Sequence, residues 1–155
     1  MPSIHSVLVA VDDKIDTVID DERLERLARV ALEREGFAPS ELSVMITDDA
    51  TVRELNRTYA GEDASTDVLA FSLREGEEFA APDGVIRLGE VIISYPTARR
   101  QAEEAGWSID DEVDHLLVHG VLHLVGYDHA AAADEERMQA REQELLAAAG
   151  LTRRL

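Results

Sequence analysis

The spacing of apolar residues changes several times along the chain between strand-like and helix-like patterns. Runs rich in branched residues predict four strands, the first over residues 4–11. Apolar positions three and four apart predict an amphipathic helix from Asp20 to Glu35, which Gly36 ends. The other predicted strands cover 42–47, 68–73 and 88–94, and four more helices are predicted over about 49–59, 94–104, 108–125 and 132–149.

Short polar residues and glycines mark the ends of these helices. Asp49, Ser94 and Ser108 are predicted N-caps, because their side chains can accept a hydrogen bond from the first-turn backbone. Residues 60–67 are a predicted polar connector, and 74–87 a long exposed turn. The order β-α-β-α-β-β-α-α-α predicts an α+β fold: one domain over 1–155, with a small four-stranded mixed sheet and about five helices.

Composition narrows the class of protein. With 155 residues, 45% hydrophobic and 31% charged, the chain is typical of a soluble globular domain with one core. No apolar run approaches the length of a membrane span, and no signal peptide is visible, so we expect no membrane partner. The absence of cysteine excludes disulfides, thiolate metal ligands and cysteine nucleophiles.

The chain is strongly acidic. It has 15 basic and 33 acidic residues, for a formal charge of -18, and Lys14 is its one lysine. This balance opposes loose binding to nucleic acid, which depends on clustered cations, although it leaves room for a local basic groove. Solubility explains the acidity more simply than any particular partner does.

Four of the five histidines lie within a stretch of fifteen residues. His119 and His123 are four apart on a predicted helix, so their imidazoles share one face and can meet at one metal. Gly126 ends the helix, and the turn after it can bring His129 back toward that face. Three imidazoles without a thiolate suit one zinc ion per chain, with nickel, copper or iron open, and leave a fourth position for water. The bland alternative is three separately hydrogen-bonded histidines.

The neighbours of these histidines limit the chemistry. His115, one turn earlier, is expected to support the site or to lie at the surface rather than to bind the metal. Asp128 is either a partner of a ligand imidazole or a turn residue. Gly120 stands where a His-Glu-x-x-His protease has its glutamate base, so ordinary metalloprotease chemistry would lack its base here. Because glycine has no side chain, Gly120 can also let another element pack closely against the helix.

The sequence also resembles a known family in several blocks. Residues 119–129, His-Gly-Val-Leu-His-Leu-Val-Gly-Tyr-Asp-His, resemble the hallmark of the bacterial YbeY family. Further matching positions are Leu55, Asn56, Arg57, Tyr59, Asp63, residues 66–69, Phe71, residues 88–94, Glu135, Met138 and Glu142. The resemblance covers nearly the whole chain.

The resemblance implies a metal-dependent endoribonuclease, normally with zinc, in the cytoplasm. It implies a role in ribosomal RNA maturation, notably at the 3′ end of 16S rRNA, and in ribosome quality control. It also implies that His119, His123 and His129 hold the metal. The expected partners are single-stranded RNA or rRNA and the ribosome or its assembly factors.

Some positions depart from the family pattern. Ala60 and Glu62 stand where the family often has an arginine and a lysine, and Ser65 and Ala70 replace its usual proline and serine. Arg57 is the substitute we name for holding substrate phosphate. Other substitutes are Arg53, Arg74 and Arg87, and each of the four is equally a solubilising surface arginine.

The catalytic residues are not identified by the sequence. Glu90 and Asp67 are candidates for a general base only if folding brings them to the metal. Two other functions stay open. One is a ribosome-assembly or binding factor with a mainly structural metal, which the charge of -18 favours. The other is metal-dependent hydrolysis of a small molecule or peptide, which needs no basic groove.

Overall fold

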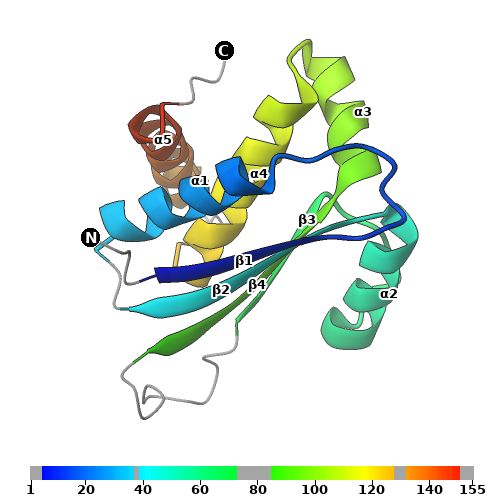
Figure 1. Cartoon of the computed structure of the whole chain (residues 1–155), viewed down its shortest axis with the longest axis horizontal. Coiled ribbons are helices and arrows are strands. Elements are labelled where there is room, and N and C mark those ends of the chain that lie inside the picture. Colours follow the sequence, from blue (N-terminus) through cyan, green and yellow to red (C-terminus); the bar gives the residue numbers. More distant parts are fainter. Residues whose placement is uncertain (1–4, 37–38, 73–84, 128–131, 151–155) are drawn as a thin grey trace.

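Four strands form one mixed sheet in the computed structural model of the chain, which describes residues 5–36, 39–72, 85–127 and 132–150 (Figure 1). Their order across the sheet is β1-β2-β4-β3. The strands β1 (His5–Val11), β2 (Ser40–Thr47) and β4 (Ile86–Ser94) run parallel, and β3 (Val68–Ser72) pairs antiparallel with β4. The predicted four-stranded mixed sheet is confirmed.

Five helices surround the sheet in the described part of the chain: α1 (Asp21–Arg34), α2 (Asp49–Ala60), α3 (Tyr95–Ala105), α4 (Ile109–Leu124) and α5 (Ala132–Ala148). Figure 1 shows α1, α4 and α5 together on one side of the sheet. Helix α4 is the central one, since it contacts β3, β4, α1, α3 and α5. Within the described ranges, no helix combines the length and apolar character that crossing a membrane requires.

The alternation of side chains along the strands explains which face the helices cover. In β2, Leu42, Val44 and Ile46 are buried in the core, and the residues between them are more exposed. The same alternation puts Phe71 of β3 on the other face, where its ring lies 5.6 Å from that of Tyr59 in α2. Helix α2 therefore covers part of the face that α1, α4 and α5 leave open.

The helix ends follow the predicted caps with one correction. The predicted caps Ser94 and Ser108 each accept a hydrogen bond from the backbone N–H three residues later. Asp20, predicted as the first residue of its helix, is the N-cap of α1 and accepts in the same way from Arg23. For α2 the cap is Asp48, which accepts from Thr51 N at 2.9 Å, and the prediction of Asp49 was wrong by one residue. Asp48 and Asp49 both offer a carboxylate as acceptor. Contacts of Asp49 with residues far along the chain leave Asp48 as the cap.

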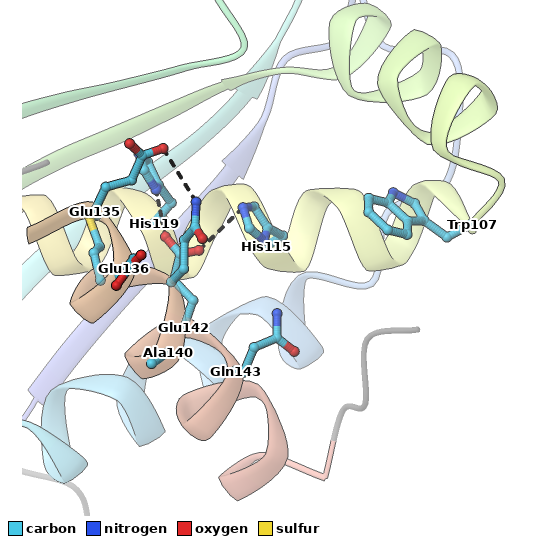
Figure 2. Close-up of a pocket in the computed structure, with 10 residues that line it drawn as sticks. Trp107, His115, His119, Glu135, Glu136, Ala140, Glu142 and Gln143 are labelled. Carbon is cyan, nitrogen blue, oxygen red and sulfur yellow. Dashed lines mark hydrogen bonds and ion pairs between the residues drawn. The ribbon is translucent and has the colours of Figure 1, made fainter. Parts of the chain in front are cut away.

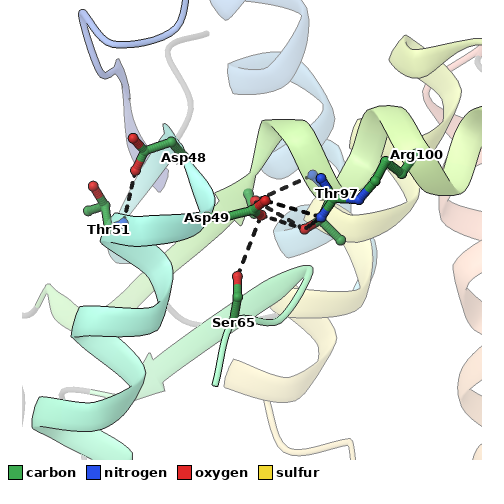
Figure 3. A network of polar contacts seen from close by, with 7 residues as sticks. Asp48, Asp49, Thr51, Ser65, Thr97 and Arg100 are labelled. Atoms are coloured by element: carbon green, nitrogen blue, oxygen red, sulfur yellow. Dashed lines mark hydrogen bonds and ion pairs between the residues drawn. The ribbon is translucent and has the colours of Figure 1, made fainter. Parts of the chain in front are cut away.

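Asp49 instead joins three elements at one end of the sheet (Figure 3). Its carboxylate accepts hydrogen bonds from the hydroxyls of Ser94 at 2.5 Å and Thr97 at 2.6 Å, and from Arg100 at 3.1 Å. Burial opposes ionisation of this carboxyl, but the three donors outweigh it and lower the pKa of Asp49. The cluster ties the start of α2 to the end of β4 and to α3.

Two strands begin two residues earlier than predicted, β2 at Ser40 and β4 at Ile86. β4 begins at Ile86, whose N–H donates to the carbonyl of Pro39 at 2.8 Å, so residues 86 and 87 belong to the strand and not to the predicted turn. Residues 74–84 of that predicted turn lie outside the described ranges, and so does residue 73, the predicted end of the strand 68–73.

Candidate metal centre

Helix α4 carries a row of histidines on one face. His115, His119 and His123 are spaced one turn apart, and all three are half-buried. The rings of His119 and His123 lie 4.7 Å apart, and their Nε2 atoms face each other at 3.2 Å. The two histidines that the sequence pairs are therefore brought together by the helix.

The separation of these two nitrogens can be tested against metal geometry. Zinc bonds imidazole nitrogen at about 2.0–2.1 Å, and two such bonds at a tetrahedral angle put the nitrogens about 3.3 Å apart. The observed 3.2 Å matches this separation. The spacing of the two nitrogens therefore suits a single divalent ion.

A buried carboxylate from α5 lies behind the histidines (Figure 2). The side chain of Glu142 is only 2% exposed. One of its oxygens, Oε2, lies 2.6 Å from His119 Nδ1, and Oε1 lies 3.5 Å from His115 Nε2. In the part of the chain that the structure describes, these three residues form a group whose ligand-type atoms all lie within 4.8 Å of one another.

The distances distinguish two possible ligand sets. Two ligands of one zinc ion lie about 3.3 Å apart, and 2.6 Å is the length of a charge-assisted hydrogen bond. The contact between Glu142 and His119 is therefore a hydrogen bond, and the pair that suits an ion is His119 with His123. His115 contacts the carboxylate from the far side.

Gly120 lets α4 approach the sheet beside the first histidine. A Cβ at this position would lie 2.7 Å from Cγ1 and 3.1 Å from Cγ2 of Val91 in β4. A larger residue would force the Val91 side chain or the helix to shift, as real Cβ atoms do not approach so closely. The expected close packing at this glycine is confirmed.

The predicted turn after the histidine helix is also present. Gly126 has φ +113°, a backbone conformation that favours glycine, and Tyr127 N–H donates to the carbonyl of Leu122 at 2.9 Å. His129 and Asp128 lie outside the described residues. The third predicted ligand therefore stays a prediction.

A cavity of about 740 Å³ opens between α4 and α5 beside this cluster (Figure 2). Its lining combines the two histidines with carboxylates, amides and one indole: His115, His119, Glu135, Glu136, Glu142, Gln139, Gln143, Trp107, Met138 and Ala140. Because three of these groups are carboxylic acids, this side of the site suits a cation better than a phosphate.

Known proteins match the chain over most of its length. The family model described as "Endoribonuclease YbeY" matches residues 10–150. The chain belongs to the YbeY family.

Curated relatives agree with this assignment. An Endoribonuclease YbeY from Moorella thermoacetica is 47% identical over 150 residues, covering 92% of this chain and 96% of the relative. The one from Bacillus velezensis is 41% identical over 155 residues, covering 96% and 99%. Family membership confirms the predicted enzyme class, an endoribonuclease.

A solved structure supports the fold. The solution structure of the protein TM1509 from Thermotoga maritima aligns with a TM-score of 0.58 and 22% sequence identity, covering 91% of this chain and 89% of that one. At this identity the likeness concerns the arrangement of the elements, which agrees with the mixed sheet described above.

The arginine named for phosphate binding lies among carboxylates. Arg57, one of the positions that match the YbeY pattern, donates to both oxygens of Glu54 at 2.7 and 2.8 Å, and its side chain is 56% exposed. Donating these hydrogen bonds to Glu54 raises the pKa of Arg57. Arg53 makes a similar pair with Asp63 at 2.7 Å. Either would have to leave a carboxylate to hold a phosphate, at small cost for exposed pairs.

The two candidates for a general base, Asp67 and Glu90, lie on the sheet and its edges, whereas the histidines lie on α4. Asp67 accepts hydrogen bonds from Val68 N–H at 2.8 Å and from Gln101 at 3.3 Å, so it joins β3 to α3. Glu90 precedes Val91, whose side chain faces Gly120, and neighbouring strand residues point to opposite faces. Glu90 is therefore on the sheet face turned away from α4.

Sequence reasoning missed the role of Glu142. Its position matches the YbeY pattern, but nothing in the local sequence links it to a histidine 23 residues earlier. One signal was present: Glu142 lies four residues after Met138 and three before Leu145, both buried. A charged residue in an apolar helical stripe needs a buried polar partner.

Proposed function

We propose that this chain is a metal-dependent endoribonuclease that cuts single-stranded RNA in ribosomal RNA processing. The observation that carries the proposal is the 3.2 Å approach of the His119 and His123 Nε2 atoms in a member of the YbeY family. The finer roles we propose are maturation of the 3′ end of 16S rRNA and ribosome quality control, in the cytoplasm, with the ribosome or its assembly factors as partners.

The proposed ligands are His119, His123 and His129, with one zinc ion per chain. A zinc ion held in this way supplies a Lewis acid that stabilises negative charge on a phosphate. The chain itself supplies a half-buried row of imidazoles, fixed on α4 by the close packing of Gly120 on Val91. We propose that residues 1–155 act as one domain.

The structure supports a modest contribution of the protein to phosphate binding. Arg53 and Arg57 are paired with carboxylates, and the cavity on the α5 side is acidic. We propose Arg57 as the residue that holds substrate phosphate, exchanging Glu54 for the RNA backbone. The metal then carries the larger share of substrate recognition.

The test combines metal content with RNA cleavage. Elemental analysis of the purified full chain should give one zinc per chain, and a labelled single-stranded RNA should be cut in a chelator-sensitive manner. His123→Ala should lose both the metal and the cleavage while it keeps a wild-type circular dichroism spectrum. His115→Ala, on the same helix, should keep one metal per chain.

The other outcomes contradict the proposal in distinct ways. A tightly held metal without cleavage of naked RNA or of ribosomal particles would favour the assembly-factor function. Chelator-sensitive hydrolysis of small esters or peptides, with RNA untouched, would favour the small-molecule hydrolase. A folded protein that binds no metal would overturn the central claim.

A further inference from the structure

Glu142 is placed in an unusual environment for a carboxylate. It lies on α5 in an otherwise apolar stripe, and its side chain is 2% exposed. A buried carboxylate is costly unless it is well hydrogen-bonded, so packing alone does not explain its position. Its two oxygens are divided between two histidines of α4: Oε2 lies 2.6 Å from His119 and Oε1 lies 3.5 Å from His115.

The short contact determines which nitrogen of His119 carries the proton. A carboxylate can only accept, so His119 Nδ1 must donate to it. In a neutral imidazole the other nitrogen, Nε2, then carries a lone pair. That nitrogen is the one that faces His123 Nε2 at 3.2 Å.

We infer that Glu142 is a positioning residue for the metal centre, which holds His119 in the tautomer and ring orientation that metal binding needs. The inference rests on the proposed function. Ligand histidines commonly donate their second ring N–H to a carboxylate in this way, which fixes the ring and raises its basicity.

His115 completes this arrangement from the other side. Its ring lies nearly parallel to that of His119, with centroids 6.2 Å apart, and its Nε2 approaches the second oxygen of Glu142. It therefore helps to hold the carboxylate. Because Glu142 belongs to α5, the docking of α5 on α4 and the geometry of the metal centre depend on each other.

The experiment compares Glu142→Gln with Glu144→Gln in the full chain. Glu144 is a matched control, since it lies on the same helix, is mostly exposed and pairs with Arg141. The first readout is zinc affinity by competition with a chelator. We expect E142Q to bind zinc about 10–100-fold more weakly and E144Q to match the wild type.

The second readout uses metal-free protein. Long-range ¹H–¹⁵N spectra at mildly alkaline pH report which ring nitrogen of a neutral histidine carries the proton. His119 should be the Nδ1–H tautomer in the wild type and a mixture in E142Q. Glu142→Asp keeps the charge but retracts it by one methylene. It should show both changes in milder form, and it carries the test if E142Q does not fold.

Several results would overturn the inference. Wild-type zinc affinity in E142Q would do so. Weaker affinity with an unchanged His119 tautomer would do so too, because the loss would then come from charge alone. If His123→Ala loses zinc and E142Q does not, only this inference fails. If His115→Ala loses zinc and His123→Ala keeps it, the proposed ligands fail as well.

Discussion

Asp114 lies on α4 one residue before the first histidine of the row and ties the helix to α1. Its Oδ1 accepts from Arg23 Nε at 3.2 Å and Nη2 at 3.1 Å. Burial raises the pKa of Asp114 to about 6, more than the guanidinium of Arg23 lowers it. This carboxyl therefore binds its proton more tightly in the folded chain than in the unfolded one.

The sign of the pH dependence follows from that difference. Between pH 4 and 6 the folded state holds more protons at Asp114 than the unfolded state, so its contribution to stability falls as pH rises. Relative to Asp114→Asn, the wild type should lose at most about 3 kcal/mol of unfolding free energy from pH 4 to pH 7. Urea denaturation of both proteins across this range measures it. If the wild type instead gained unfolding free energy relative to Asp114→Asn as pH rises, the ion pair with Arg23 would outweigh the effect of burial.

At the scale of elements, the contact between α4 and β4 fixes where the histidines lie. Gly120→Ala should gain up to about 1 kcal/mol of helix propensity and lose about 1–3 kcal/mol from the clash with Val91. We therefore expect a net loss of stability of about 1 kcal/mol in urea denaturation.

The matched control shortens Val91, the side chain that an alanine at position 120 would meet. In a Val91→Ala background the space beside residue 120 opens, and the same Gly120→Ala change should become neutral or stabilising. If the alanine were equally destabilising in both backgrounds, the contact with Val91 would not be what requires a glycine here.

Local sequence patterns predicted the elements because their causes are local. Ser94 and Ser108 cap helices through a backbone N–H three residues away, so their roles follow from the neighbouring sequence. Asp48 and Asp49 could not be told apart, because Asp49 is drawn to Ser94 and Thr97, some 45 residues later in the chain.

In the candidate site, too, local contacts could be predicted from the sequence and long-range contacts could not. His119 and His123 are one helical turn apart, and the spacing alone predicts that they meet. The contact between Glu142 and His119 depends on how α5 packs on α4. The sequence alone therefore shows only that Glu142 is a charged residue among apolar helix positions. The strand order β1-β2-β4-β3 is also a product of long-range pairing.

At the scale of the whole molecule, charge determines how the protein meets RNA. The formal charge is -18, and most arginines in the described ranges already lie within 4.0 Å of a carboxylate. These paired arginines are Arg23, Arg29, Arg53, Arg57, Arg87, Arg100, Arg137 and Arg141. Each pair reduces the field that would attract phosphates.

We therefore expect the binding of single-stranded RNA to depend weakly on salt. Each phosphate neutralised on a single strand contributes a slope of about -0.7 to log affinity against log salt, and contact with at most about three phosphates gives a slope no steeper than about -2. Fluorescence anisotropy of the zinc-loaded wild-type chain with a nuclease-resistant analogue of single-stranded RNA measures this between about 50 and about 200 mM salt. A slope of about -4 or steeper would contradict it.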